Sequence, residues 1–271
     1  MQTHKLISPM NLENICIDVI KLVKSTGKFI TDELEKNVGI VTESKGLHNY
    51  VTYVDKTSEN ILIEGLSQII PESGFIAEEG TNITKGEVYN WIIDPLDGTT
   101  NYIHGLPPYA ISVALMQEKK IILGVIYELG RKECFYAWEG GKSFLDGNEI
   151  RVSNTGKVTD SLIATGFPYH NYLYLDNFMK TLKYFMENSH GLRRLGSAAT
   201  DIAYVACGRF EAFYEYGLSP WDVAAGVIII KQAGGKVSDF KGGDNYIFGG
   251  EIIISNSKIF NEFSTVIKSL M

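Results

Sequence analysis

The sequence predicts an α/β fold in which helices alternate with short strands. Several segments carry apolar residues at helical spacing, and between them lie short apolar runs bounded by turn residues, which are typical of buried strands. The chain has 271 residues, of which 45% are hydrophobic. This content suits one large domain over residues 1–271, or two closely packed halves, with a sizeable core.

The composition favours a cytoplasmic protein with no nucleic-acid or membrane partner. The net charge is −7 and the isoelectric point about 5.3, with no basic run, which disfavours nucleic-acid binding. Cys16, Cys134 and Cys207 lie far apart, which argues against a disulfide framework or a zinc knuckle. No apolar run approaches the ~20 residues of a membrane helix, and no signal-peptide core is evident.

The first part of the chain predicts two amphipathic helices separated by a polar segment. The first helix places on its apolar face Leu12, Ile15, Cys16, Val19, Ile20 and Val23. Residues 43–53 are interpreted as an exposed loop or hairpin. The second helix begins after Asp55, its expected N-cap, buries residues between Ile61 and Ile69, and ends at Pro71.

The middle of the chain predicts strands of a sheet. Residues 75–77 form a short strand that ends in Glu78 and Glu79, and residues 91–93 form a buried strand. Further strands are expected at residues 109–116, 121–127 and 134–138, with a turn at 146–148.

The last part alternates helices and strands again. Helices are expected at residues 174–188, from the N-cap Ser197 to about Cys207, at 223–232, and around Phe260 to Ile267, with strands at 213–215 and 252–255. The first of these carries a stripe suited to a core or a dimer interface, namely Leu175, Phe178, Met179, Leu182 and Phe185.

Residues 91–102 are the stretch most indicative of chemistry. Asp94 and Asp97 follow the buried strand, and Pro95 between them turns the chain so that both carboxylates can converge with the exposed carbonyl of Leu96. Carboxylate and carbonyl oxygens are ligands for Mg²⁺ or Ca²⁺ rather than for zinc.

The segment Gly98-Thr99-Thr100 is expected to begin a helix, whose amides would bind phosphate beside the metal. The simpler alternative is a polar turn in which Asp97 is only an N-cap. An EF-hand is excluded, because the twelfth loop position would be Gly105 or Pro108 instead of Glu.

The run Asp94-Pro95-Leu96-Asp97-Gly98-Thr99-Thr100-Asn101-Tyr102 closely resembles the signature of the inositol monophosphatase family. Further similar segments surround Asp55, Glu78, Gly196 and Asp222, in the family's chain order. The resemblance implies an αβαβα sandwich like that of fructose-1,6-bisphosphatase, a homodimer, and a lithium-sensitive phosphatase acting on a small phosphate monoester.

The resemblance also implies a set of metal ligands. Glu78, Asp94 and the Leu96 carbonyl would hold one Mg²⁺, while Asp94, Asp97 and Asp222 would hold a second, and a weaker third ion would lie near Glu78. By the same resemblance Mn²⁺ would substitute for Mg²⁺, and Ca²⁺ and Li⁺ would inhibit.

The remaining roles are likewise carried over from the family. Asp55 and Thr99 would activate water, assisted by Glu78 as a catalytic metal ligand, and amides near Gly98 and Thr99 would hold phosphate. The substrate would be contacted by Asp97, Gly98, Thr99, Gly196, Ser197, Ala198, Glu215 and Asp222.

Several points stay open at this level. Inositol 1-phosphate is the first candidate substrate, with fructose 1,6-bisphosphate, histidinol phosphate and 3′-phosphoadenosine 5′-phosphate as alternatives, and a non-catalytic metal-binding interaction protein as a further one. The sequence does not assign roles to four more residues, which are Lys45, Glu79, Arg193 and Arg194.

Overall fold

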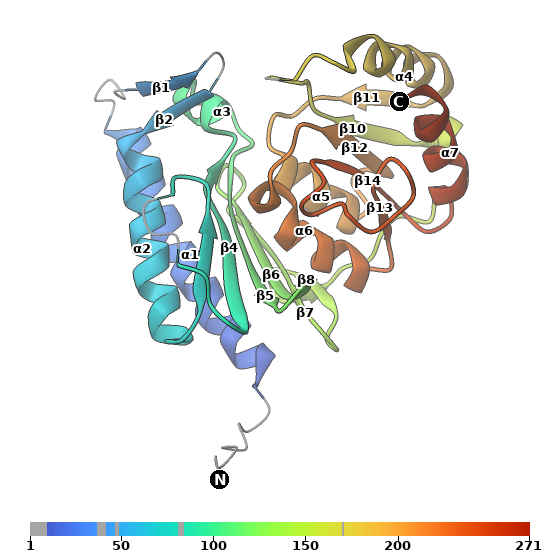
Figure 1. Cartoon of the computed structure of the whole chain (residues 1–271). Coiled ribbons are helices and arrows are strands. Elements are labelled where there is room, and N and C mark those ends of the chain that lie inside the picture. Colours follow the sequence, from blue (N-terminus) through green and yellow to red (C-terminus); the bar gives the residue numbers. More distant parts are fainter. Residues whose placement is uncertain (1–9, 37–41, 47–48, 81–83, 170) are drawn as a thin grey trace.

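Five layers of secondary structure stack in the order helix, sheet, helix, sheet, helix (Figure 1). The computed structural model describes residues 10–36, 42–46, 49–80, 84–169 and 171–271. The helical layers are α1 (Leu12–Glu35) with α2 (Tyr53–Ile69), α5 (Ala198–Ala206) with α6 (Pro220–Gln232), and α4 (Leu175–Asn188) with α7 (Phe260–Leu270). This order confirms the αβαβα sandwich that the family resemblance implied.

The first sheet has seven strands in the order β3-β4-β5-β6-β7-β8-β9. They are β3 (Gly74–Ala77), β4 (Tyr89–Asp97), β5 (Ala110–Gln117), β6 (Lys120–Glu128), β7 (Glu133–Trp138), β8 (Ser143–Leu145) and β9 (Asn148–Glu149). In β4, Trp91 and Ile93 pack with residues of α1 and α2, whereas Ile92 packs with residues of α6. Because both faces are covered, the strand has a continuous apolar run instead of an alternating one.

The second sheet has five strands in the order β11-β10-β12-β14-β13. They are β10 (Leu162–Thr165), β11 (Gly191–Arg193), β12 (Ala212–Tyr216), β13 (Lys236–Ser238) and β14 (Glu251–Ser255). Its outer face packs on α4 and α7 through an aromatic cluster in which Phe185, Tyr214 and Phe263 meet at ring-centroid distances between 5.0 and 6.0 Å.

Helix α6 lies between the two sheets and is buried almost all round, from Val223 to Ile230. Its close approach to the first sheet depends on Gly124 in β6, where a Cβ would lie 2.4 Å from the Ala225 carbonyl oxygen. The first turn of α6 carries Asp222, so this packing fixes where that carboxylate lies. No helix in the described part of the chain has both the length and the apolar composition of a membrane span.

Two local expectations were wrong. Strand β4 continues through Pro95 to Asp97 instead of ending before Asp94. Helix α2 begins at Tyr53 and is capped by Thr52, while Asp55 lies in its first turn. On α4, Phe178 and Phe185 are buried in the core, whereas Leu175 and Met179 are exposed, so that a dimer interface at this stripe stays a prediction.

The polar segment 43–53 is confirmed as a hairpin, formed by β1 (Thr42–Gly46) and β2 (Asn49–Thr52). Lys45 belongs to β1, but its side chain lies outside the described part of the structure. Short elements that the sequence did not predict are β10, β11, β13 and the 3₁₀ turn η1 (Val158–Asp160). Each has only three or four residues, which is too short for a periodic pattern.

Candidate active site

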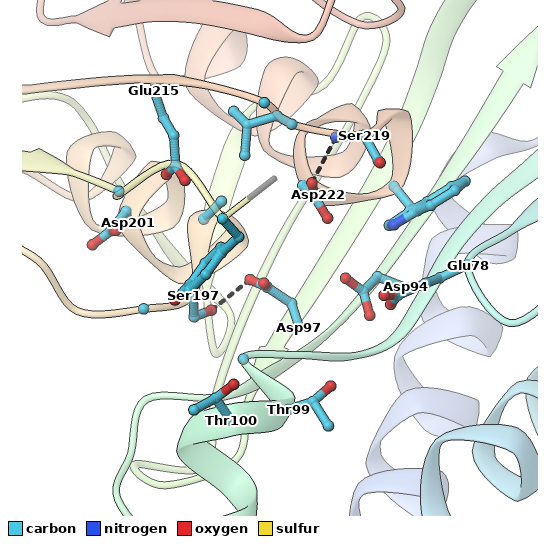
Figure 2. A pocket seen from close by; sticks show the side chains of 18 of the residues that line it. Glu78, Asp94, Asp97, Thr99, Thr100, Ser197, Asp201, Glu215, Ser219 and Asp222 are labelled. Carbon is cyan, nitrogen blue, oxygen red and sulfur yellow. Dashed lines mark hydrogen bonds between the residues drawn. The ribbon is translucent and has the colours of Figure 1, made fainter. Parts of the chain in front are cut away.

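A cleft of about 320 Å³ opens between the two sheets and is lined from both. One wall consists of the end of β4 and the start of α3 (Thr99–Ile103). The other consists of the starts of α5 and α6 and the end of β12. Figure 2 shows polar and acidic side chains from both walls converging in this cleft.

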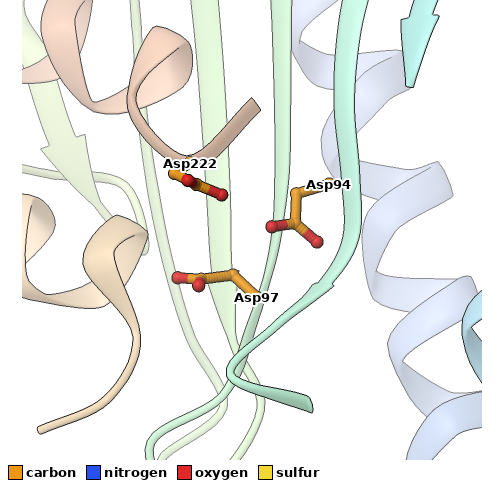
Figure 3. Close-up of side chains that lie close together, drawn as sticks. All are labelled: Asp94, Asp97 and Asp222. Atoms are coloured by element: carbon orange, nitrogen blue, oxygen red, sulfur yellow. The ribbon is translucent and has the colours of Figure 1, made fainter. Parts of the chain in front are cut away.

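Three carboxylates lie together in the cleft, those of Asp94, Asp97 and Asp222 (Figure 3). One oxygen from each lies within 4.8 Å of the others. Residues three apart in a regular strand point to opposite faces, but the pairing of β4 with β5 shifts register between Asp94 and Asp97. This irregularity places both side chains on the side of β4 that faces Asp222.

Asp94 and Asp222 are oriented by backbone amides that lie close to them in the sequence. Asp94 Oδ1 accepts a hydrogen bond from the Leu96 amide at 2.9 Å. Asp222 Oδ2 accepts one from the Ser219 amide at 2.7 Å, as part of the capping box of α6. Asp222 is therefore the acidic residue in the first turn of α6.

Asp97 is oriented by the start of α5. Its Oδ2 accepts hydrogen bonds from Ser197 Oγ at 2.6 Å and from the Ala199 amide at 2.8 Å. The N-cap of α3 is Gly98, at a φ of +89°, so the interpretation of Asp97 as an N-cap is wrong. Anchoring one oxygen leaves Oδ1 available for a cation, a pattern that orients metal ligands in proteins.

The cluster concentrates negative charge away from water. Burial raises the pKa of Asp97 to about 6. Burial and then the charges of neighbouring carboxylates, including Glu78, raise the pKa of Asp94 and of Asp222 well above their usual range. No described lysine or arginine forms an ion pair with Asp94, Asp97 or Asp222.

A hard divalent cation would compensate this charge, and an all-oxygen donor set fits Mg²⁺ or Mn²⁺. Glu78 follows β3, lines the same cleft and lies beside Asp94 (Figure 2). Leu96 lines the cleft as well, and its carbonyl oxygen lies 3.0 Å from Thr99 Oγ1. Every metal ligand expected from the sequence therefore lies at one place, and the metal assignment itself stays a prediction.

Asp55 lies behind Thr99, outside the cleft lining. Thr99 Oγ1 is 3.0 Å from Asp55 Oδ1 and 3.0 Å from the Leu96 carbonyl oxygen. The other oxygen, Oδ2, accepts hydrogen bonds from the amide and hydroxyl of Thr52. Asp55 is 1% exposed, and burial raises its pKa despite these bonds. It can reach a substrate only through Thr99.

The expected substrate contacts all line the cleft. Ser197 is the N-cap of α5, as predicted, and its hydroxyl already has partners in Asp97 and Thr200. Gly196 has a φ of +94°, and a Cβ there would lie 2.5 Å from Arg194 Nη1. Glu215 is buried, which raises the pKa of its carboxyl to about 8.

The structure also assigns places to residues whose role the sequence left open. Glu79 lies outside the cleft lining, and its amide donates to Glu59 Oε2 at 2.7 Å. Arg193 is exposed, and its Nη1 donates to the Leu192 carbonyl. Arg194 lines the cleft.

Sequence reasoning missed Asn101, Gly166 and Asp201. Asn101 Nδ2 donates to the carbonyls of Pro108 and Leu195, each at 2.8 Å, and so connects α3 to the loop before α5. The position of Asn101 within the motif of residues 94–102 is the sequence signal that could have identified it. Gly166 and Asp201 line the cleft, but nothing in their local sequence indicates this.

We expect the metal-free protein to lose stability as the pH rises from about 4 to about 6. Between the ordinary Asp pKa of 3.8 and the folded value of about 6, the folded protein binds more protons at Asp97 than the unfolded chain does. The free energy of unfolding therefore falls with rising pH, by on the order of 2 kcal/mol from this group.

The measurement is the melting temperature in EDTA across this pH range, for wild type and Asp97→Asn. Because Asn does not titrate, the stability difference between the two proteins isolates this group. The melting temperature of the wild type should fall relative to that of the variant as the pH rises. Saturating Mg²⁺ should restore the melting temperature of the wild type. A difference in melting temperature that does not change with pH, or that changes in the opposite direction, would contradict the raised pKa of Asp97.

Known proteins match this chain over most of its length. The model of the inositol monophosphatase family matches residues 11–269. The chain is 37% identical to the Nus factor SuhB of Pseudomonas aeruginosa, over 92% of this chain and 94% of that protein. It is 37% identical to the inositol-1-monophosphatase of Mesorhizobium japonicum, over 89% and 91%.

The fold is similarly matched among solved structures. The crystal structure of the extragenic suppressor protein SuhB of Bartonella henselae superposes with a TM-score of 0.90 at 33% identity. The match covers 97% of this chain and 100% of that one.

Proposed function

The chain belongs to the inositol monophosphatase family, and we propose that it is a Mg²⁺-dependent phosphatase whose first candidate substrate is inositol 1-phosphate. The observation that carries this proposal is the convergence of Asp94, Asp97 and Asp222 beside Glu78 in one cleft. Without a cation this arrangement is costly, because the buried Asp94 and the partly buried Asp97 and Asp222 place three carboxylates together. A divalent ion would bind to these carboxylates and offset their charge, and an anionic substrate could then bind to the ion.

The metal ligands would be Glu78, Asp94 and the Leu96 carbonyl for one Mg²⁺, and Asp94, Asp97 and Asp222 for a second. A third, weaker ion would lie beside Glu78. Mg²⁺ in such a site acidifies water and offsets negative charge on a phosphoryl group. Mn²⁺ is the expected replacement, and Ca²⁺ and Li⁺ are the expected inhibitors.

Thr99 and Asp55 would handle the proton of the attacking water. The Thr99 hydroxyl can donate to Asp55 Oδ1, which leaves its lone pairs to accept a hydrogen bond from water in the cleft. Asp55 is held from the other side by Thr52, so it keeps this hydroxyl oriented. The amides of Gly98 and Thr99, at the start of α3, would hold phosphate oxygens.

The substrate is proposed to be a polyol monophosphate. Glu215, together with the backbone of Gly196 and Ala198, offers hydrogen bonds to hydroxyl groups, and the Mesorhizobium japonicum relative is named an inositol-1-monophosphatase. Fructose 1,6-bisphosphate, histidinol phosphate and 3′-phosphoadenosine 5′-phosphate are the alternatives within the same chemistry.

The test is Mg²⁺-dependent phosphate release from these four substrates under one set of conditions. The expected result is the highest kcat/KM for inositol 1-phosphate and no release in EDTA. Preference for another of the four would keep the chemistry and replace the substrate. Undetectable release from all four, by a protein that still binds metal, would refute the proposal.

The second candidate function is that of a metal-binding interaction protein. It is favoured by the name of the Pseudomonas aeruginosa relative, a Nus factor. For this reason the expectation that the chain has no macromolecular partner stays a prediction. Retained metal binding without turnover would favour this candidate over the phosphatase.

The proposal includes a cytoplasmic homodimer with one catalytic unit per chain. The cytoplasm is supported by three cysteines that form no disulfide. One catalytic unit is supported by a cleft lined from both sheets. Sedimentation of the purified protein would measure the oligomeric state.

We expect Gly166→Ala to raise KM for inositol 1-phosphate by about tenfold, which corresponds to the loss of one hydrogen bond between substrate and protein. A Cβ at Gly166 would lie 1.9 Å from Glu215 Oε1 and would push that carboxylate aside. Gly156→Ala is the matched control, since a Cβ there meets nothing within 4 Å. Equal KM values for the two variants would contradict a substrate contact at Glu215.

A further inference from the structure

Asp201 is a buried acid with one carboxylate oxygen, Oδ1, that has no hydrogen-bond partner among the described residues. It lies on α5, is 1% exposed and lines the cleft. Its Oδ1 is shielded from solvent, and no described residue donates a hydrogen bond to it. Buried polar atoms in native structures nearly always have partners, and exceptions often mark functional sites. Figure 2 shows Asp201 on the side of the cleft where Glu215 lies, away from Asp94 and Glu78.

Arg194 is the corresponding unsatisfied donor on the same wall. Its guanidinium lies over the rings of Phe167 and Tyr169, at 5.4 and 5.2 Å from their centroids, which fixes its position. Its Nε is buried without a hydrogen-bond partner among the described residues. The charge of Arg194 acts on both Asp201 and Glu215.

These three groups do not satisfy one another. In the described part of the chain, no ion pair or hydrogen bond joins the Arg194 guanidinium to the carboxylate of Asp201 or Glu215. The cleft therefore contains one donor in a fixed position, the Arg194 guanidinium, and two acceptors, the carboxyl groups of Asp201 and Glu215, which are not bonded to it. A ligand between them must accept from the guanidinium and donate to the carboxylates.

Hydroxyl groups meet this requirement, because each one both donates and accepts. An ammonium group would satisfy the carboxylates but would be repelled by the guanidinium. A second phosphate would satisfy the guanidinium but would add negative charge beside Asp201 and Glu215, where burial already disfavours it. An alcohol with neighbouring hydroxyl groups can accept from the Arg194 guanidinium and donate to Asp201 and Glu215.

We propose that Arg194 and Asp201, together with Glu215, form a subsite that binds the hydroxyl groups of the substrate and thereby determines specificity. This inference rests on the proposed function and extends it to two residues without an assigned role. Leaving buried polar groups unpaired costs stability in the free protein, and binding of the correct alcohol recovers it. An analogue without hydroxyls recovers nothing.

The experiment compares inositol 1-phosphate with cyclohexyl phosphate, which has the same ring without the other hydroxyls. Asp201→Leu removes the acceptor at similar size, Asp201→Asn keeps one acceptor oxygen, and Arg194→Met removes the donor. Arg193→Met is the matched control, because Arg193 is exposed and outside the cleft lining. The readouts are kcat/KM for each substrate and the melting temperature.

The ratio of the two kcat/KM values should fall by about tenfold to a hundredfold in Asp201→Leu and Arg194→Met. It should fall less in Asp201→Asn and stay unchanged in Arg193→Met. The melting temperature of Asp201→Leu should equal or exceed that of wild type, since an unpaired buried carboxylate is removed. A merely structural role would instead lower the melting temperature and leave the ratio unchanged.

Unchanged ratios in all variants, or proportional losses on both substrates, would overturn the subsite. Binding of myo-inositol to the Mg²⁺-loaded protein, read by ligand-observed NMR, separates this outcome from failure of the proposed function. Binding by wild type and loss in Asp201→Leu would support the subsite even if no phosphate were released. Equal binding by both proteins, or none by either, would overturn it.

Discussion

Asp94→Asn is expected to lower Mg²⁺-dependent phosphate release by at least about a thousandfold, while the protein keeps its fold. Asp94 would be a ligand of both proposed metal ions, and the charge stabilisation supplied by such ions amounts to several kcal/mol. The fold should survive because an Asn oxygen can still accept the hydrogen bond from the Leu96 amide, which Asp94 Oδ1 accepts at 2.9 Å. The measurement is single-turnover phosphate release, with circular dichroism as the check on folding.

Asp239→Asn is the matched control for this exchange. Asp239 is 8% exposed and its Oδ1 accepts amide hydrogen bonds from Lys241 and Gly243, but it lies outside the cleft. It makes the same kind of local turn contact as Asp94 without facing the acidic cluster. Full activity in Asp239→Asn together with full activity in Asp94→Asn would refute the metal assignment.

Thr99→Ala is expected to lower kcat by about a hundredfold with little effect on metal binding. Among the described residues, the Thr99 hydroxyl connects Asp55, buried at 1% exposure, to the cleft, where it can influence a water. Proton transfer by a positioned side chain contributes on the order of a hundredfold or more. The measurements are kcat and the Mn²⁺ dissociation constant.

Thr99→Ser is the control, because it keeps the hydroxyl and removes only a methyl group. It should retain kcat within about tenfold, since the weaker constraint on χ1 of Ser is the only loss. Equal activities of Thr99→Ala and Thr99→Ser would show that the hydroxyl has no part in the reaction.

The sequence singled out Asp94 and Asp97 as candidate metal ligands because their positions depend on local chain geometry, and the metal assignment itself stays a prediction. Asp94 and Asp97 lie around one irregularity of β4, and Asp222 lies in the first turn of α6. A signature motif identifies such local features. That Asp222 reaches the other two depends on the packing of α6 between the sheets, for which only the resemblance gave evidence.

The parts that the sequence did not predict depend on contacts between distant segments. Whether Arg194 contacts a surface acid or the cleft is decided by Phe167 and Tyr169, which lie on another loop. Asp201 follows a helix start and has an ordinary local sequence, so nothing distinguished it from a solvated acid. Met179 has helical spacing suited to a core, yet α4 covers the sheet with only one narrow face.

We infer that the carboxylates of the cleft bind the divalent ions that phosphate hydrolysis requires. The most direct measurement is anomalous X-ray diffraction from crystals grown with Mn²⁺. The account predicts anomalous peaks among Asp94, Asp97 and Asp222 and between Asp94 and Glu78, all lost in Asp94→Asn crystals. Mn²⁺-dependent phosphate release by a protein whose crystals show no peak in this cleft would contradict it.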